Sequence, residues 1–278
     1  PGFLTLEPDA LGAWRPQGPA SEVEPPAPRW RSSFAAFAAM DVAWHLANLV
    51  AGPLGYPRYR SHELVHPVRE WLGWGAKALR WPRRRAGRAQ ALARIAAARG
   101  PVFLMALQLE TDFQIRDRYP AGMRAALAAA LASFDRAAPP DALFVVKPHP
   151  LDPGLTPWAR LAAHPRAAFL DGGPAEALFP RLTGVVTVNS TLGLSALRAG
   201  VPVAAMGPAV WEGLAWRGPL DGFWADAHRP DPTRVAAFVR QLAAEIQTPG
   251  AFDGEGMRPG AEGVAEMILR RAPLAAAA

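Results

Sequence analysis

Four polar segments, each directly after an apolar run, contain the residues of this 278-residue chain that are best suited to chemistry. They are residues 108–114, 147–150, 171–173 and 189–193. Plain turns need only turn-forming residues, whereas all four segments contain side chains able to bind a ligand or transfer a proton. The pattern predicts a ligand site to which all four segments contribute.

The segment Asn189-Ser190-Thr191 stands between an apolar run and a helical pattern, within VNSTLGLSALRAGVPV. Unpaired backbone N–H groups and hydroxyls at the start of a helix bind phosphate well, because the positive end of the helix dipole lies there. An ordinary Ser or Thr helix cap is an equally good interpretation. The region lacks the glycine patterns of dinucleotide-binding folds and P-loops, which argues against both.

The segment Lys147-Pro148-His149-Pro150 places an ammonium group beside an imidazole, on a backbone that two prolines stiffen. The pair can neutralise a phosphate leaving group, and His149 can donate a proton because an unperturbed histidine titrates near neutrality. The alternative is a solvated lysine beside an ordinary loop histidine. We favour the functional interpretation, because Lys147 is one of only two lysines among 30 basic residues.

Two carboxylates, Glu110 and Asp112, stand two residues apart in LQLETDFQIR. If this segment is extended, both side chains share one face of it. A carboxylate at the mouth of a cationic crevice can act as a nucleophile or a general base. A helix cap, or a salt bridge to Arg116 or Arg118, are the alternatives, and spacing does not decide between them.

Positioning these residues requires a regular framework, and the chain after Gly100 supplies one by alternating apolar runs with helical stretches. Strands are predicted at residues 101–107, 142–147, 167–170, 184–188 and 201–206, with helices or helical turns at 121–138, 158–164, 174–179 and 192–198. Strands that are apolar on both faces and alternate with helices indicate a doubly wound parallel sheet of the α/β class. Such sheets bind ligands beyond the carboxyl ends of their strands, where the polar segments lie.

The first hundred residues have a different character. PGFLTLEP predicts a terminal strand, residues 17–28 a loop, and residues 33–50, 66–81 and 86–99 three helices. The long apolar stretch at residues 34–54 is interrupted by Asp41 and His45, which favours a buried helix over a membrane span. The opening residues do not have the pattern of a secretory signal.

Charge is concentrated in one segment. The chain has a formal net charge of +6, with 30 Lys and Arg against 24 Asp and Glu, yet residues 77–100 contain eight cations and no acid. Absence of cysteine excludes disulfide scaffolds, thiolate metal sites and thiol nucleophiles. His62 and His66 lie four residues apart, but no carboxylate-rich segment accompanies them, and we predict no metal site.

Several longer strings carry a family resemblance. VFLMALQLETDFQIR, SFDRAAPPDALFVVKPHPLDPG, DGGPAEALFPRLTGVVTVNSTLGLSALRAGVPVAAMG and GPLDGFW occur in the order found in the capsule polysaccharide biosynthesis/export family of the KpsS/LipB type, which residues 101–242 resemble. The resemblance implies a GT-B-like glycosyltransferase that needs no cofactor. It would move Kdo from CMP-Kdo onto a lyso-phosphatidylglycerol or Kdo-linker acceptor, with a retained β linkage.

The same resemblance implies roles for individual residues. Gln108 and Asp112 match a Q-x-x-x-D element, in which the glutamine is an expected donor contact and the aspartate resembles the catalytic carboxylate of retaining β-Kdo transferases. Elements K-x-H-P and N-S-T are expected to contact the CMP phosphate, and here they are Lys147, His149, Pro150, Asn189, Ser190 and Thr191. Retention requires either a covalent Asp112–Kdo adduct or a front-face displacement, and the resemblance favours the adduct.

One departure from the family pattern matters. A GT-B enzyme has two Rossmann-like domains, whereas this chain shows one, preceded by a mostly helical segment. We therefore expect residues 1–100 to be a linker and a helical remnant of an amino-terminal half, and residues 101–278 to be the donor domain with carboxyl-terminal helices. By itself such a chain should bind CMP weakly and transfer poorly.

The family resemblance, with its lipid acceptor, suggests a role for the basic segment at residues 77–100. Tryptophans flank or enter it, and aromatic and cationic residues together are typical of surfaces that meet anionic lipid. Trp81, Arg83, Arg84 and Arg85 are the predicted membrane or acceptor contacts, in a cytoplasmic protein peripheral to the inner membrane. A solvated helix face is the alternative, and nucleic acid is disfavoured because no binding motif accompanies the charge.

Two further functions stay open at this point. A GT-B transferase of another nucleotide sugar would use the same crevice, and a non-catalytic capsule export or scaffold component could keep the fold without the reaction. Other capsule assembly proteins are expected partners in either case.

Overall fold

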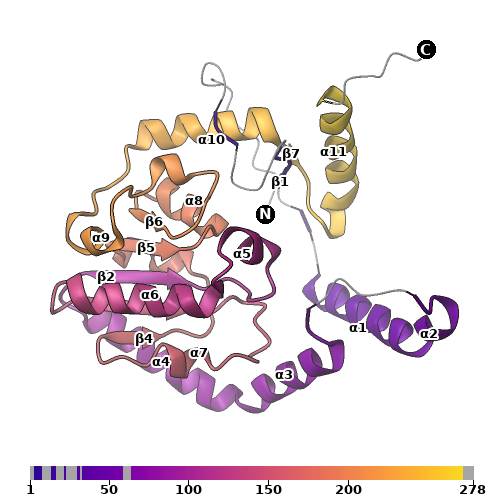
Figure 1. The fold of residues 1–278 in the computed structure, drawn as a ribbon, viewed down its shortest axis with the longest axis horizontal. Helices are drawn as coiled ribbons and strands as arrows, with labels where there is room; N and C mark the ends of the chain where they lie inside the picture. The colour runs from indigo at the N-terminus through magenta and orange to yellow at the C-terminus, as the bar shows by residue number, and fades with distance from the viewer. Residues whose placement is uncertain are drawn as a thin grey trace. The chain divides into compact units, whose positions relative to one another are not determined.

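The computed structural model of this chain describes residues 3–7, 14–16, 22, 30–31, 33–58 and 64–271. These residues form two compact units, which Figure 1 shows. The larger unit contains residues 64–235, and the smaller contains the described residues before 59 and after 235. Every predicted site residue lies in the larger unit.

The larger unit is built on a sheet of five parallel strands in the order β4-β3-β2-β5-β6. The strands are β2 (Val102–Ala106), β3 (Leu143–Lys147), β4 (Ala167–Phe169), β5 (Gly184–Thr187) and β6 (Val203–Ala205). All residues of the three inner strands are buried, as expected for parallel strands covered on both faces. The predicted α/β class with a doubly wound parallel sheet is confirmed.

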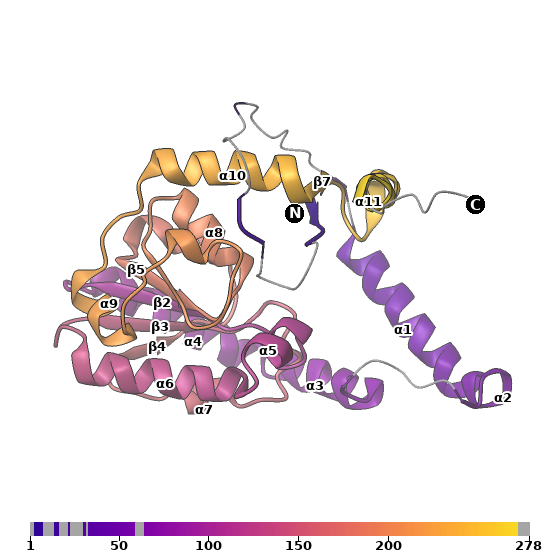
Figure 2. The same ribbon diagram turned by 45° about the horizontal axis from the view of Figure 1, so that its top comes forward.

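Helices cover both faces of this sheet. They are α3 (Pro67–Leu79), α4 (Trp81–Ala97), α5 (Phe113–Arg118), α6 (Gly122–Ala137), α7 (Trp158–Leu161), α8 (Thr191–Arg198) and α9 (Leu220–Asp226), with 3-10 turns η1 (Glu176–Arg181) and η2 (Glu212–Leu214). Figure 2 shows α6 and α8 on opposite sides of the sheet. Helix α4 packs against the edge strand β4, so the basic segment of the sequence lies beside the sheet.

An aromatic cluster fixes α6 and α9 to one face of the sheet. Trp224 of α9 stands edge-on to the rings of Phe103, Phe134 and Phe144, with centroids 5.1, 5.3 and 5.7 Å away. Its indole Nε1 donates a 2.9 Å hydrogen bond to Ser133 Oγ, which satisfies the buried polar atom. Phe223 and Trp224, the last two residues of the segment GPLDGFW, are thus part of the sheet's core.

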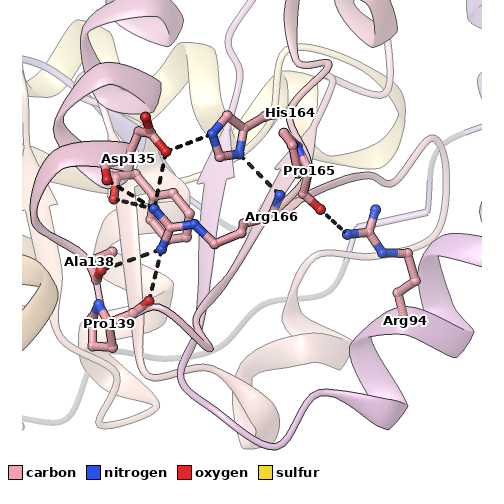
Figure 3. Close-up of polar contacts among 8 residues, drawn as sticks. Arg94, Asp135, Ala138, Pro139, His164, Pro165 and Arg166 are labelled. Atoms are coloured by element: carbon pink, nitrogen blue, oxygen red, sulfur yellow. Dashed lines mark hydrogen bonds and ion pairs between the residues drawn. The ribbon is translucent and has the colours of Figure 1, made fainter.

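A polar clamp holds the carboxyl end of α6, as Figure 3 shows. The Arg166 guanidinium donates to the backbone carbonyls of Phe134, Asp135, Ala138 and Pro139. Asp135 Oδ1 lies 2.9 Å from His164 Nε2 and 3.3 Å from Arg166 Nη2. The hydrogen bond from His164, followed by that from Arg166, lowers the pKa of Asp135. These contacts satisfy the last carbonyls of α6, so the cluster is structural.

The smaller unit contains a two-stranded antiparallel sheet, in which β1 (Phe3–Thr5) pairs with β7 (Gln247–Pro249). The predicted terminal strand is thus confirmed. Its other elements are α1 (Phe34–Val50), α2 (Gly52–Gly55), most of α10 (Pro232–Ile246), the 3-10 turn η3 (Gly254–Gly256) and α11 (Met257–Arg271). The loop predicted at residues 17–28 lies, apart from Glu22, outside the described residues.

The prediction that residues 34–54 form a buried helix is wrong in one respect. The segment is helical, but α1 exposes its large apolar side chains, with Met40 75% and Trp44 61% exposed. The element that α1 contacts most is α2, which has four residues and is too short to cover it. None of the helices in the described ranges has the length and apolar character to cross a bilayer.

Helices α3 and α4 belong to the same unit as the sheet. Pro82 lies in the first turn of α4, where a missing N–H costs nothing, and Arg80 separates the two helices. The division at residue 100 into an amino-terminal remnant and a donor domain stays a prediction.

Candidate functional site

The predicted site segments meet because strands β2, β3, β4 and β5 are parallel neighbours, which puts their carboxyl ends at one edge of the sheet. Residues 108–114, 147–150, 171–173 and 189–193 follow these four strands in turn. The topology therefore assembles the site from all four segments, as the sequence predicts.

Gln108 and Asn189 form a reciprocal pair across this edge. Gln108 Nε2 donates to Asn189 Oδ1 at 2.8 Å, and the backbone N of Asn189 donates to Gln108 Oε1 at 3.1 Å. Both residues are buried, with 6% and 8% of their surface exposed. The pair ties the chain after β2 to the chain after β5, so both side chains position these two loops.

Helix α8 begins directly after this pair. Ser190 is its N-cap, and Ser190 Oγ accepts a 3.2 Å hydrogen bond from the backbone N of Leu192. The N–H of Gly193 donates to the Ser190 carbonyl, whereas Thr191 is the exposed first residue of the helix. Ser190 thus fills the capping role that the sequence left open. Thr191 still presents a hydroxyl and a backbone N–H at the positive end of α8.

Lys147 is the last residue of β3 and is only 5% exposed. Its Nζ donates a 3.2 Å hydrogen bond to the carbonyl of Gly172, in the loop after β4. Burial lowers its pKa, and the charge of Asp171 opposes that effect. Lys147 is therefore a cation held inside the site, which settles that it is not a solvated loop lysine.

His149 is half-buried, and its orientation is fixed by the turn that follows it. The backbone N of Leu151 donates a 3.1 Å hydrogen bond to His149 Nδ1, so the neutral ring carries its proton on Nε2. Burial lowers the pKa of His149, against the opposing charges of Asp112 and Asp152. At neutral pH the ring is uncharged and can donate one hydrogen bond through Nε2.

The two carboxylates of LQLETDFQIR do not share a face, which corrects the prediction of an extended segment. The chain turns after β2, with the N–H of Asp112 bonded to the Leu109 carbonyl at 3.1 Å. Asp112 is then the N-cap of α5, where Oδ1 accepts from the backbone N of Gln114 at 2.8 Å. One oxygen of Asp112 thus caps a helix, and its charge acts on His149.

Glu110 serves a separate contact. It forms an ion pair with Arg124 at 2.6 Å, and Thr156 Oγ1 also donates to it. The salt bridge to Arg116 or Arg118 considered from sequence is wrong, because Glu110 pairs with Arg124 of α6 and Arg118 pairs with Asp117. Asp112 is the carboxylate of this pair that lacks an ion pair among the described residues.

The basic segment contributes to the same edge of the sheet. Arg84 of α4 binds Asp171 through two hydrogen bonds, Nε to Oδ2 at 2.5 Å and Nη2 to Oδ1 at 2.8 Å. Burial opposes ionisation of Asp171, but Arg84, Lys77 and Lys147 outweigh it and hold the pKa of the carboxyl below its ordinary value. The sequence predicts Arg84 as a lipid contact, whereas the structure engages its guanidinium in this ion pair.

Arg88 lies one turn further along α4, over the loop after β4. Gly172 and Gly173 both have positive φ, +104° and +77°. A Cβ on Gly173 would come within 2.8 Å of Arg88 Nη2, so the missing side chain makes room for this guanidinium. Sequence reasoning missed Arg88, and the pair of glycines after a predicted strand is the signal that could have found it.

A cavity of about 200 Å³ opens between α3, α4 and the loop after β3. Cations at its wall include Lys77, whose Nζ donates to the Asp152 carbonyl at 2.6 Å, together with Arg80 and Arg84. Burial lowers the pKa of Lys77, with Asp171 opposing. The cavity lies beside Pro148, and its wall carries these three cations against two carboxylates, Asp152 and Asp171.

Three of the four predicted lipid contacts are exposed on α4. Trp81, Arg83 and Arg85 are exposed, and the Arg85 guanidinium stacks over the Trp81 ring at 5.5 Å from its centroid. Pro150 is also exposed, beyond His149.

The residues within the described ranges include no cluster of His, Asp or Glu that could hold a metal ion.

Comparison with known proteins finds one family. Residues 18–252 match the sequence model of the capsule polysaccharide biosynthesis proteins. The capsule polysaccharide export protein KpsS of Escherichia coli is 27% identical over 223 residues, which is 76% of this chain and 56% of KpsS. The capsule polysaccharide modification protein LipB of Neisseria meningitidis serogroup B is 28% identical over 279 residues, or 91% of this chain and 66% of LipB. The chain thus spans between about half and two thirds of these relatives.

Solved structures show distant likenesses. A Thermosulfurimonas dismutans KpsC β-Kdo 2,7 transferase aligns with a TM-score of 0.40 and 16% identity, covering 66% of this chain and 62% of that one. The glycosyltransferase SnogD of Streptomyces nogalater aligns with a TM-score of 0.34 and 17% identity, covering 61% and 44%. No conclusion rests on likenesses at this level.

Proposed function

The chain belongs to the capsule polysaccharide biosynthesis protein family, and from that membership we propose that its larger unit is the donor-binding part of a glycosyltransferase. The donor is CMP-Kdo, and the acceptor is a lyso-phosphatidylglycerol or a Kdo linker built on it. The observation that carries the proposal is the convergence of Lys147, His149 and the start of α8 at the carboxyl ends of β3 and β5. Such a cationic, hydrogen-bonding edge is suited to a nucleotide phosphate.

Each side chain at this edge has a proposed role in binding the donor phosphate. The buried Lys147 supplies positive charge in a low-dielectric setting, where it counts for more than at the surface. His149 donates from Nε2 to a phosphate oxygen, since Nδ1 is already occupied by Leu151. Thr191 offers its hydroxyl and N–H at the positive end of α8. Gln108 and Asn189 hold the two loops at fixed separation, so they position the site without needing to touch the donor.

Asp112 is the proposed nucleophile. Its second carboxylate oxygen attacks the anomeric carbon of Kdo while the bond from that carbon to the CMP phosphate oxygen breaks, and CMP leaves with the electron pair. The acceptor hydroxyl then displaces Asp112 from the same carbon and loses its proton to a base, which regenerates the carboxylate. Two inversions give net retention. The half-buried position of Asp112 beside His149 supports this role.

We propose that the exposed part of the basic segment binds the membrane lipids among which the acceptor lies. Trp81 and Arg85, one turn apart on α4, form an aromatic and cationic face, and Arg83 is exposed two positions from each of them. Such faces bind anionic lipid headgroups, each cation contributing about 1 kcal/mol. We place the protein at the cytoplasmic face of the inner membrane on this basis, as a peripheral protein that meets other capsule assembly proteins there.

Calorimetric titration of the chain with CMP, and with UDP as the comparison, tests the donor assignment. We expect CMP to bind more tightly, and Lys147→Gln to weaken CMP at least tenfold. Arg160→Gln removes one exposed positive charge from α7 and is the matched control, which should change nothing. Tighter binding of UDP would point to another nucleotide sugar, and unchanged CMP affinity in Lys147→Gln would remove the phosphate site proposed here.

Catalysis needs its own assay, because the chain covers only part of its relatives. Radiolabelled Kdo transfer, with the CMP-Kdo generated in place, measures turnover by residues 1–278, which we expect to be slow. Mass spectrometry of the intact protein during turnover should show a Kdo adduct on Asp112. Proven turnover with no adduct, or with the adduct elsewhere, contradicts the two-step mechanism. Transfer-dead protein that still supports capsule assembly would favour the scaffold interpretation.

A further inference from the structure

A second cavity, of about 470 Å³, lies beside the edge strand β6. Its wall includes Pro202 and Val203, at the amino end of that strand, whereas the site described above lies at the carboxyl ends. Phe223 also lines it and is fully buried against Gly184, the first residue of β5. Its volume falls within the range of about 300–1,000 Å³ usual for small-molecule sites. The cavity is thus at the opposite end of the sheet from the candidate donor site.

Trp216 is a fixed aromatic ring in this cavity. Its backbone N donates to the Val203 carbonyl at 2.8 Å, which extends the sheet by one residue beyond β6. Its indole Nε1 donates to the Pro219 carbonyl at 3.0 Å. A Cβ on Gly218 or Gly222 would come within about 3 Å of the ring, so both glycines leave space for it. Backbone, indole and neighbours together hold Trp216 in one orientation.

Three arginines line the same cavity as this ring and have no bonded partner among the described residues. Arg217, Arg229 and Arg234 all line the cavity, and none of their guanidinium groups makes a hydrogen bond or ion pair with a described residue. Arg217 Nη2 lies 3.7 Å from the Cβ position of Gly213, so this side chain folds back over the cavity wall. By contrast, Arg84, Arg94, Arg124, Arg136 and Arg166 are all engaged in the same unit.

The charge balance of the cavity favours an anion. Asp231 is the acidic residue in its wall, and Asp231 Oδ1 already accepts from the backbone N of Thr233 at 2.8 Å, at the start of α10. Against this one carboxylate stand three guanidinium groups and His228. Guanidinium groups bind carboxylates and phosphates through paired hydrogen bonds, and the three in this cavity wall can supply them.

The aromatic geometry offers one indole ring as a stacking surface for the rest of the ligand. Phe223 and His228 stand at 63° and 65° to the Trp216 ring, with centroids 6.2 and 6.3 Å away. No second ring lies parallel to Trp216 among the described residues, so there is no slot for a flat base between two faces. A single indole surface beside cations suits the apolar face of a pyranose that bears an acid group.

We propose that this cavity is a binding site for acidic saccharides, in which Arg217, Arg229 and Arg234 bind the carboxylate and Trp216 supports the sugar ring. The cavity is separate from the donor edge, by which we mean the carboxyl edge of the sheet with Lys147, His149 and Thr191. It does not depend on the reaction proposed there. A site at this end of the sheet can hold an acidic glycan while the opposite edge binds a nucleotide.

Nuclear magnetic resonance of the Trp216 indole N–H, assigned through Trp216→Phe, measures binding at the site itself. Glucuronate and glucose are the probes, since they share a pyranose ring and differ by the carboxylate. We expect glucuronate to shift the resonance saturably, more weakly at high salt, and glucose to bind at least tenfold more weakly. Equal responses to both sugars, or no response to glucuronate, would overturn the proposal.

Substitutions show which residues bind glucuronate. The double variant Arg229→Gln/Arg234→Gln should weaken glucuronate about tenfold, as the loss of charge-assisted hydrogen bonds requires, while Arg160→Gln leaves it unchanged. Both arginines are exposed, and an unchanged thermal midpoint shows that the double variant is folded. Lys147→Gln should keep the glucuronate response, which separates this site from the donor edge. Unchanged affinity in the double variant, or tighter binding of CMP than of glucuronate at Trp216, would refute the assignment.

Discussion

Gln108 and Asn189 hold each other through two hydrogen bonds, across 81 positions of sequence and between neighbouring strands β2 and β5. The residues are buried, so neither amide can turn to solvent if its partner is lost. These two hydrogen bonds determine the distance between the turn before α5 and the start of α8. The donor edge depends on that spacing, because Asp112 stands on one side of it and Thr191 on the other.

Gln108→Leu should therefore destabilise the fold by about 1–3 kcal/mol, since it leaves the side chain of Asn189 buried without its partner. Urea denaturation measures this free energy of unfolding. Asn189→Leu should cost a similar amount, and the double variant less than the sum of the two. Additive costs in this cycle would show that the pair does not act as a unit.

The ion pair of Arg84 and Asp171 predicts a dependence of stability on pH. The pKa of Asp171 is lower in the folded state than in the unfolded chain, so its contribution is fully present above the unfolded value of about 4. The contribution is lost as pH falls through the folded value. Urea midpoints compared between pH 7 and pH 3 should fall more steeply for the wild type than for Asp171→Asn. Parallel slopes would contradict the assignment.

The pKa of His149 should change when CMP binds. Because burial lowers its pKa, the resonance of its ring should titrate below the ordinary range of histidine, near 6.5. Binding of CMP brings negative charge near the ring and should raise that pKa again, and any proton taken up goes to Nδ1 in place of its bond from the Leu151 N–H. Calorimetry in two buffers of different ionisation enthalpy measures the uptake. A free histidine that titrates at its ordinary value would contradict the effect of burial, and a pKa that CMP leaves unchanged would show that the ring does not face the phosphate.

The sheet was accessible to sequence reasoning and parts of the site were not, for definite physical reasons. Runs such as Val102–Ala106 are apolar on both faces, a pattern that few structures other than an inner parallel strand satisfy. The pairing of Arg84 with Asp171 spans 87 positions and depends on how α4 packs against β4, which no local pattern encodes. The exposure of α1 was misjudged because apolar composition predicts a need for burial and does not identify the surface that provides it.

Asp112 shows the same limit at the level of one residue. Its sequence allows a cap, a salt bridge or a nucleophile, and the structure shows that one oxygen is the cap of α5. Capping and catalysis are compatible, because a carboxylate has two oxygens and the cap uses one of them. Only a substitution that separates the two roles can test the second.

Asp112→Asn is that substitution. Asparagine caps a helix as well as aspartate, so stability should stay within about 0.5 kcal/mol of the wild type, while Kdo transfer should be abolished because an amide oxygen is a poor nucleophile. Asp112→Ala is the matched variant that removes both roles, and it should cost about 1 kcal/mol of stability in addition. Urea denaturation and the radiolabel assay measure the two quantities on the same samples. Transfer that survives in Asp112→Asn would leave the residue as a cap alone.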